Sequence, residues 1–193
     1  MSRAFSFCVA PLLLLLLGAN TQERPRLTFA GLGDIQIGMT SDQVKALGFR
    51  LTSSGPWEKI GDPEFVACHY LDSSLSFPGV AVMMSDNQVV RIDIGFRSAA
   101  ENWQSLSGAK IGMSQTDVKA IYGDWLQISR HPYLDDAGSY LTLTSSDGQY
   151  AMIFETSAKD MTGNVVDAKT QVQHITDFRA GLADYVRFIE GCA

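Results

Sequence analysis

Few side chains of this 193-residue chain could perform catalysis or bind a metal. His69, His131 and His174 form no H-x-x-x-H or H-x-H pair, so each is interpreted as a solvated or core-edge histidine. Asp135-Asp136 could bind Ca²⁺ or act in acid–base chemistry, but the alternating acidic positions of a calcium loop are missing, which favours a polar turn. The sequence also lacks a G-x-S-x-G elbow and a phosphate-binding glycine loop. We therefore expect no metal, no cofactor and no enzymatic activity.

The N-terminus is typical of an exported protein. Arg3 precedes an apolar run over 5–19 that ends in small residues, the layout of a secretory signal peptide, which we place at residues 1–20. Leu17 fits the cleavage rule poorly, so an uncleaved anchor is the alternative. The apolar run is short for a bilayer span of roughly 20 residues, and we expect no stable membrane insertion after cleavage. The predicted location is periplasmic or secreted.

Composition argues against anionic partners. Without Arg3, 14 basic side chains face 21 acidic ones, a net charge of −7. An acidic chain without Lys/Arg clusters is poorly suited to nucleic acid or to anionic lipid surfaces.

Cysteine usage predicts a single disulfide. With Cys8 removed in the signal peptide, Cys68 and Cys192 remain, and an even pair in an exported protein favours a bond between them. On the chain-entropy model, closing the long loop between them contributes about 4–5 kcal/mol. The alternatives are two free thiols or a catalytic cysteine, for which the sequence offers no C-x-x-C spacing and no nearby basic cluster.

Aromatic residues are the best candidates for binding a partner. Trp57, Tyr133 and Tyr150 lie in predicted loops or at strand ends, where they could anchor a protein or a sugar. Trp103 and Trp125 flank the second of two predicted helices, and we expect both to close a core between the two halves of the chain.

The elements that position these residues begin with a repeated phrase. "IGMTSDQVKAL" starts at Ile37, and "IGMSQTDVKAI" starts at Ile111. Each phrase has the pattern of a helix N-terminus followed by two apolar residues three positions apart, which share one helix face. A glycine follows each phrase and predicts the end of a short helix, at Gly48 and at Gly123.

Both predicted helices have capping residues. Thr40 is placed as the first N-cap, with Gln43 completing a capping box. Ser114 is placed as the second, with Asp117 at the third helical position, where a carboxylate favours the positive helix end.

After each helix the apolar period changes to two, which predicts strands. The last predicted strands of the two halves share the pattern Q-V-x-x-I, from Gln88 and from Gln171, at a wider spacing than that of the two phrases. The polar stretch Ser157–Lys169 is the predicted insertion, and the run Asp184–Ala193 reads as strand-like. The predicted strands are 65–71, 80–85, 88–96, 140–144, 150–155 and 171–178.

The predicted fold class is α+β, with a first repeat over 27–97 and a second over 104–193 that includes a C-terminal tail. Each of the two tandem modules has a short helical start packed on an antiparallel β-meander of three to four strands. The sheets of the two modules can align side by side and leave the face opposite to the helices open to a partner.

The phrase I-G-M-T/S-x-x-x-V-x-x-L/I, followed by a glycine and a meander, resembles the repeat of the β-lactamase-inhibitor-protein-like fold. It is also similar to the module of outer-membrane assembly lipoproteins of the SmpA/OmlA type. The resemblance covers both copies of the phrase and, loosely, the predicted strands that follow each copy. It implies two domains whose sheets form a concave protein-binding surface. The chain differs from the inhibitor, which has one disulfide in each domain.

The expected function is that of a non-catalytic exported protein that binds another envelope or secreted protein through a concave sheet surface. It would act as an enzyme inhibitor or as an accessory in envelope assembly. The alternative is a lectin-like periplasmic protein that binds a glycan through its loop aromatics.

Overall fold

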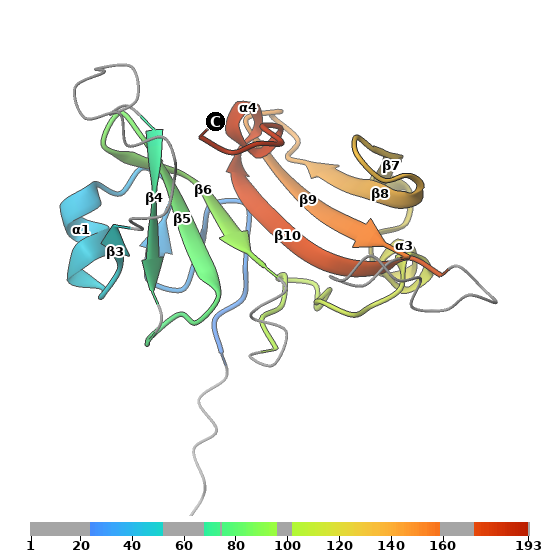
Figure 1. Ribbon diagram of the computed structural model, residues 1–193, viewed down its shortest axis with the longest axis horizontal. Coiled ribbons are helices and arrows are strands. Elements are labelled where there is room, and N and C mark those ends of the chain that lie inside the picture. The colour runs from blue at the N-terminus through green and yellow to red at the C-terminus, as the bar shows by residue number, and fades with distance from the viewer. Residues whose placement is uncertain (1–23, 52–67, 74, 96–101, 159–171, 193) are drawn as a thin grey trace, which may run out of the picture.

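The computed structural model describes residues 24–51, 68–73, 75–95, 102–158 and 172–192. The predicted signal peptide (1–20) and Trp57 lie outside the described residues. The main element is an antiparallel eight-stranded sheet with the order β3-β4-β5-β6-β10-β9-β8-β7, beside a two-stranded sheet β1-β2 (Figure 1). Its strands are β1 (Gly31–Leu32), β2 (Ile35–Gln36), β3 (Arg50–Leu51), β4 (Cys68–Ser73), β5 (Val80–Ser85), β6 (Gln88–Ile94), β7 (Gln127–His131), β8 (Asp135–Thr144), β9 (Tyr150–Ser157) and β10 (His174–Leu182). The helices are α1 (Ser41–Ala46), α3 (Gln115–Tyr122), the 3-10 helix η2 (Gly123–Trp125) and α4 (Ala183–Val186).

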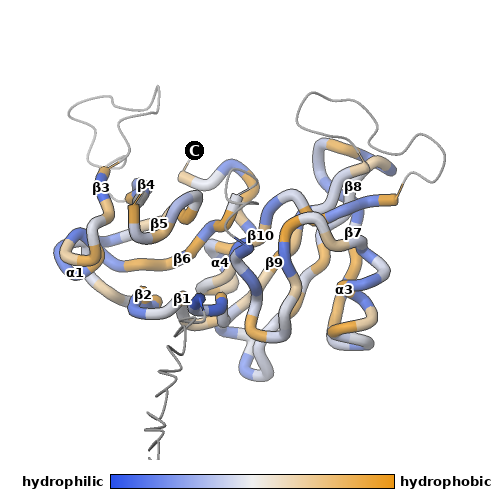
Figure 2. The backbone as a smooth tube through the Cα atoms, turned by 90° about the horizontal axis from the view of Figure 1, so that it is seen from below, coloured by the Kyte–Doolittle hydropathy of each residue, from blue (hydrophilic) through white to orange (hydrophobic). Residues whose placement is uncertain are grey.

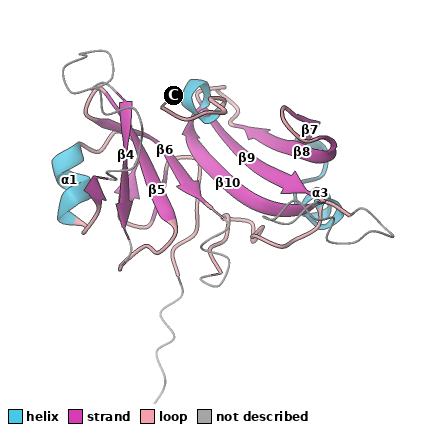
Figure 3. Ribbon diagram, viewed as in Figure 1, coloured by secondary structure: helices cyan, strands magenta, loops and turns pink. Residues whose placement is uncertain are grey.

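The predicted α+β fold class is wrong, because the protein is mostly β (Figure 3). α1, α3 and α4 have six, eight and four residues. At 1.5 Å per residue the longest of them is roughly 12 Å long, whereas the ten-residue β8 extends over roughly 33 Å. Such helices cover only a small part of a sheet. The strands of the two halves instead join through β6 and β10 into one continuous sheet, which organises the fold.

Both predicted N-caps are present, and each forms a capping box, which the sequence predicted only for the first. The Thr40 hydroxyl accepts the backbone N–H of Gln43, whose side chain accepts the N–H of Thr40. Ser114 and Asp117 make the same reciprocal pair at the start of α3. α1 and α3 lie at opposite ends of the molecule, one in each half (Figures 1 and 2).

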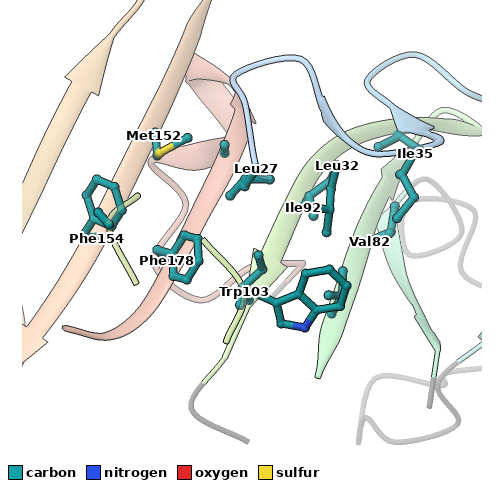
Figure 4. Close-up of a cluster of buried hydrophobic side chains, with 14 of the residues drawn as sticks. Leu27, Leu32, Ile35, Val82, Ile92, Trp103, Met152, Phe154 and Phe178 are labelled. Atoms are coloured by element: carbon teal, nitrogen blue, oxygen red, sulfur yellow. The ribbon is translucent and has the colours of Figure 1, made fainter. Parts of the chain in front are cut away.

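One hydrophobic core spans both halves. Side chains from one face of the sheet, among them Ile92, Phe154 and Phe178, pack with Leu27 from the N-terminal segment and with Trp103 from the connection between the halves (Figure 4). Each such fully buried side chain contributes about 1.5–3 kcal/mol. The core role predicted for Trp103 is therefore confirmed. The same prediction for Trp125 is wrong, since that side chain is 78% exposed.

A β-bulge interrupts β6 at Val90, and another interrupts β10 at Thr176, the equivalent position of the second half. Val89 and Ile175, the residues just before the bulges, each hydrogen-bond the turn that leads into a helix. The predicted match of Val89 with Val172 is thus wrong, since the counterpart of Val89 is Ile175. The bonds are Gly38 N–H to Val89 O, Val89 N–H to Met39 O, Gly112 N–H to Ile175 O and Ile175 N–H to Met113 O, each 2.8 or 2.9 Å long.

The pairing of β6 with β10 is symmetric about Asp93 and Arg179, which lie opposite each other. Arg179 follows Asp93 by the same number of residues by which the bulge at Thr176 follows the bulge at Val90. Asp93 and Arg179 are therefore counterparts in the repeat. An approximate two-fold axis therefore passes between them and relates the two halves of the sheet. The flanking pairs, Phe178 with Ile94 and Ala180 with Ile92, follow the same rule.

Several elements differ from the sequence prediction. The edge strands β3 and β7 were not predicted, and Asp135-Asp136 begins β8 instead of forming the predicted turn. The strand-like run predicted over Asp184–Ala193 is wrong: α4 occupies 183–186, and no strand follows it among the described residues. Ala183 and Val186 of α4 are buried against β8 and β9 on the face opposite to the main core. That sheet face, predicted to be open, is therefore covered at its centre.

Gly181 is the residue of β10 that a side chain would disturb most. An added Cβ would lie 2.2 Å from the carbonyl oxygen of Val90 on β6. We expect Gly181→Ala to lower the free energy of unfolding by about 3 kcal/mol, because the junction of the two half-sheets would have to separate. Gly148→Ala is the control, since its φ is +73° but no atom lies within 4 Å of the added Cβ, and it should lose only about 1 kcal/mol. Guanidinium denaturation of both variants measures the difference, and equal losses would contradict this account of the junction.

Candidate functional site

Four charged side chains gather on the sheet face opposite to the core, around the two-fold axis. Arg91 and Asp93 lie on β6, Glu155 on β9 and Arg179 on β10, and we call them the central charge cluster. Along β6, Arg91 and Asp93 alternate with apolar residues that enter the core, so the two-residue period of a strand places both on the other face. Arg91 and Arg179 are only 4% and 5% exposed. Buried guanidinium groups require acceptors, and these determine what surrounds the cluster.

Arg91 is held by partners from its own strand β6, from β4, from α4 and from the segment that follows α4. Its Nε donates to the Asp93 carboxylate at 3.0 Å, and its Nη2 donates to the Tyr70 hydroxyl at 2.5 Å. Its Nη1 donates to two backbone carbonyls near the C-terminus, those of Tyr185 at 3.0 Å and Phe188 at 2.8 Å. Arg91 therefore connects the first half of the sheet to the end of the chain.

Arg179 makes a parallel set of contacts in the second half. Its Nε donates to the carbonyl of Val186 at 2.7 Å, and its Nη1 donates to the Glu155 carboxylate. Nη2 is buried without a hydrogen-bond partner among the described residues, and the guanidinium lies over the ring of Tyr140, 5.2 Å from its centroid. The attraction of the cation to the ring face partly compensates for the missing acceptor.

The cluster shifts the acidity of the groups beside it. Burial raises the pKa of Tyr70 above its ordinary value, and the Asp93 carboxylate adds to this effect. Burial likewise raises the pKa of Tyr140, with a contribution from Glu155. Burial also raises the pKa of Asp93, although the neighbouring Arg91 acts in the opposite direction. Both phenols are therefore neutral in the folded protein at neutral pH, so Tyr70 offers Arg91 a neutral acceptor.

His131 links the cluster to the turn between β7 and β8. Its Nδ1 accepts the backbone N–H of Tyr133 at 3.1 Å, which assigns the ring proton to Nε2, 3.4 Å from the Glu155 carboxylate. The ring also meets Tyr140 edge-on, at 4.8 Å between centroids. Because the imidazole is buried and both of its nitrogens are engaged, its role is to position the turn that carries Tyr133.

Besides the local bond from the Phe188 N–H to the Tyr185 carbonyl, the C-terminal tail, residues 187–192, is attached to distant parts of the chain at three points. Gly191, with φ of +69°, packs so closely on Tyr70 that an added Cβ would lie 2.6 Å from the phenolic oxygen. The glycine therefore lets the backbone turn toward β4, where the tail ends in the predicted disulfide. The anchors are the bond from Arg91 to the Phe188 carbonyl, the bond from the Tyr133 hydroxyl to the Glu190 carboxylate, and the Cys68–Cys192 disulfide.

The order of the tail depends on the disulfide. Fixing six residues costs roughly 6–12 kcal/mol of conformational entropy. The charge-assisted bond from Arg91 to the Phe188 carbonyl contributes about 1.5–3 kcal/mol, and the bond from the Phe188 N–H to the Tyr185 carbonyl about 1 kcal/mol. The bond between Tyr133 and Glu190 lies in solvent and contributes little. These non-covalent contacts alone are insufficient to order the tail, so its order depends on the covalent link.

An exposed apolar surface, which we call the tail patch, adjoins the cluster. It consists of Tyr133, Phe188 and Ile189, which are 62%, 49% and 41% exposed. The contact between Tyr133 and Glu190 brings the β7–β8 turn beside the tail, so residues far apart in the sequence form one surface. Sequence reasoning identified Tyr133 but neither of the other two.

The predicted binding residues are not all brought together. His131 joins Tyr133 to the central charge cluster, since it accepts the Tyr133 N–H and contacts the Glu155 carboxylate. Tyr150, in contrast, starts β9 roughly 17 Å along the strand from Glu155 and is partly buried. Sequence reasoning also missed the central charge cluster. The available signal was the charged pair Arg91 and Asp93 at alternate positions of an otherwise apolar strand.

The described residues hold no further site of two common kinds. They contain no group of three or more His, Cys, Asp or Glu side chains placed to hold a metal ion. No helix among them is long and apolar enough to cross a membrane.

The ion pair of Glu155 with Arg179 should matter more for stability than an exposed pair. Glu155→Gln leaves a buried guanidinium without its counter-charge, and we expect a loss of about 3 kcal/mol in the free energy of unfolding. Asp136→Asn is the control, because the Asp136–Arg130 pair is 90% and 67% exposed and should contribute less than about 1 kcal/mol. Urea denaturation compares the two, and similar losses would show that the cluster is not energetically special.

The raised pKa values predict a loss of stability in alkali. Above pH 10 the tyrosines of the unfolded chain lose their protons while Tyr70 and Tyr140 of the folded protein keep theirs. Unfolding then releases protons, so stability falls as pH rises, by up to about 1.4 kcal/mol per pH unit for each tyrosine. The double variant Tyr70→Phe/Tyr140→Phe should show a shallower decline between pH 10 and 11.5 than the wild type. Identical slopes in denaturation curves would contradict the assignment.

Comparison with known proteins identifies no relative. No protein-family model matches the chain, no curated protein matches it significantly, and neither does any solved structure.

Proposed function

We propose that the protein is a non-catalytic, exported binding protein that captures another envelope or secreted protein through the tail patch. The observation that carries this proposal is that Tyr133, Phe188 and Ile189 are all exposed, and that the bond from Tyr133 to Glu190 brings the β7–β8 turn against the tail that carries the other two. Apolar groups gathered on a surface favour a protein interface, and aromatic side chains are frequent anchors there.

The support beneath the patch favours a preorganised surface. The turn that carries Tyr133 is fixed by His131, and the backbone beside Phe188 is fixed by Arg91 and the disulfide. A partner would therefore bind without first ordering these groups, which removes an entropic cost of association.

The charges around the patch indicate the chemistry of the partner. Glu190 follows Ile189 directly, and Asp135 and Asp136 follow Tyr133 at close range in the sequence. Two exposed cations lie near these three carboxylates: Arg187, and Arg130, which pairs with Asp136. The whole chain carries a formal net charge of −6. A protein surface with an apolar centre and a rim of lysine and arginine would complement this arrangement.

Two further observations support the non-catalytic and exported parts of the proposal. The charged and titratable groups of the site are engaged with one another or with the backbone, which suits a structural role. The pairing of Cys68 with Cys192 suits an oxidising compartment, periplasmic or extracellular.

The patch can be tested by capture from an extract of the host envelope. We expect the oxidised mature protein to retain a stoichiometric protein partner, and the double variant Tyr133→Ala/Phe188→Ala to retain it at least about tenfold more weakly, since anchor residues contribute about 1–2 kcal/mol each or more. Retention should also fall with added salt, because the acidic rim is screened.

Trp125→Ala is the matched control, because it removes another exposed aromatic at the far end of β7 and should leave protein capture unchanged. Capture that survives the double variant but depends on Trp125 would contradict the assignment of the site. Retention of glycan without any protein would replace the proposal with the lectin-like alternative.

A further inference from the structure

We propose that the Cys68–Cys192 disulfide is a redox latch that holds the tail patch in its binding conformation, and that reduction releases residues 187–192 while the sheet stays folded. This inference rests on the proposed function, because it concerns the regulation of the same surface. It follows from the different ways in which α4 and the tail are attached.

α4 is held without the disulfide. Its Ala183 and Val186 are buried with Tyr140 and Ile153, and the carbonyl of Val186 accepts from the buried Arg179. These contacts involve neither cysteine. The chain up to residue 186 therefore stays in place when the disulfide is broken.

The tail, by contrast, buries little of itself. Residues 187–190 are all exposed, and two of the three anchors are single hydrogen bonds, from Arg91 and from Tyr133. Phe188 also contacts Tyr185 of α4: its backbone N–H donates to the Tyr185 carbonyl at 3.2 Å, and the two rings meet edge-on at 5.5 Å between centroids. Because α4 is buried and the tail is held only by such isolated contacts, Arg187 is the first residue of the segment that would move.

The disulfide can be reached by a reductant, and its removal leaves Cys68 in position. Both cysteines are partly exposed. Cys68 belongs to β4, where it pairs with Ser85 of β5, so its backbone is fixed by the sheet. A dithiol would supply two electrons and two protons: the Sγ–Sγ bond breaks, each Sγ becomes a thiol, and the dithiol is oxidised to a disulfide. The moving part is therefore the tail.

Release of the tail would dismantle the patch. Phe188 and Ile189 would leave, and Tyr133 would lose its contact with Glu190. Arg91 would lose the carbonyl of Phe188 but keep Asp93, Tyr70 and the carbonyl of Tyr185, so the cluster beneath remains largely satisfied.

Nitrogen-15 relaxation of the full mature protein, with and without dithiothreitol, tests the latch without any partner. We expect the backbone order parameters of residues 187–192 to fall below about 0.6 on reduction, while those of α4, β9 and β10 stay near about 0.85. Unchanged order parameters in the tail would overturn the latch. Loss of order throughout the sheet would also overturn it, because the disulfide would then stabilise the whole fold.

Variants separate the latch from the proposed function. Cys192→Ser should reproduce the backbone order parameters of the reduced protein under oxidising conditions, and dithiothreitol should change them no further. Capture of the partner should fall at least about tenfold in Cys192→Ser and in the reduced wild type, as in Tyr133→Ala/Phe188→Ala. A released tail with full capture would overturn the regulatory role, whereas a released tail with no capture even in the oxidised wild type would overturn the proposed function and leave the latch standing.

Discussion

Two guanidinium groups buried on one face of a β-sheet are the constraint on which the rest of this structure depends. Arg91 and Arg179 carry more donors than the neighbouring carboxylates can satisfy, and an unsatisfied buried donor is costly. The end of the chain supplies the missing acceptors, with carbonyls of Tyr185, Val186 and Phe188 directed at the two arginines. The position of α4 and the start of the tail thus follow from the electrostatics of the sheet face. The same contacts explain why the sheet face that carries the two arginines has charged groups at its centre. They also place Phe188 of the tail at its margin.

The two faces of the sheet divide the tasks of folding and recognition. The apolar face merges both halves into one core, to which the N-terminal segment and Trp103 contribute. The approximate two-fold axis passes between Asp93 and Arg179, and α4 and the tail of the second half cross it on the polar face, where Arg91 of the first half binds their carbonyls. A duplicated scaffold therefore has one asymmetric surface. The exposed aromatic groups of the tail patch lie on it, which connects the architecture to the proposed binding function.

The way in which the chain is attached to the sheet changes at Arg187. Up to Val186, burial and buried hydrogen bonds fix the chain. From Arg187 onward the side chains are largely exposed, and isolated hydrogen bonds and the link from Cys192 to Cys68 hold the segment. A surface whose order depends on one covalent bond is well suited to control, since a single chemical change alters its shape without unfolding the core. The core and the sheet thus stabilise the fold, whereas the tail held by the disulfide forms the proposed binding surface.

The sequence by itself determined the local features of this protein. The capping boxes at Thr40 and Ser114, the central strands of each half and the pairing of Cys68 with Cys192 follow from patterns within a few residues, or from the scarcity of cysteine. Only the tertiary structure decided the mostly β fold class, the counterpart of Val89, the helical form of α4 and the exposure of Trp125. These features depend on contacts between distant segments. The run from Asp184 has the apolar spacing of a strand, but Arg91 on β6 and Arg179 on β10 draw its carbonyls inward as a helical turn. A local sequence pattern reports only the secondary structure that a segment favours. A buried charged side chain needs hydrogen-bond partners that lie far away in the sequence, and these come together only in the folded protein.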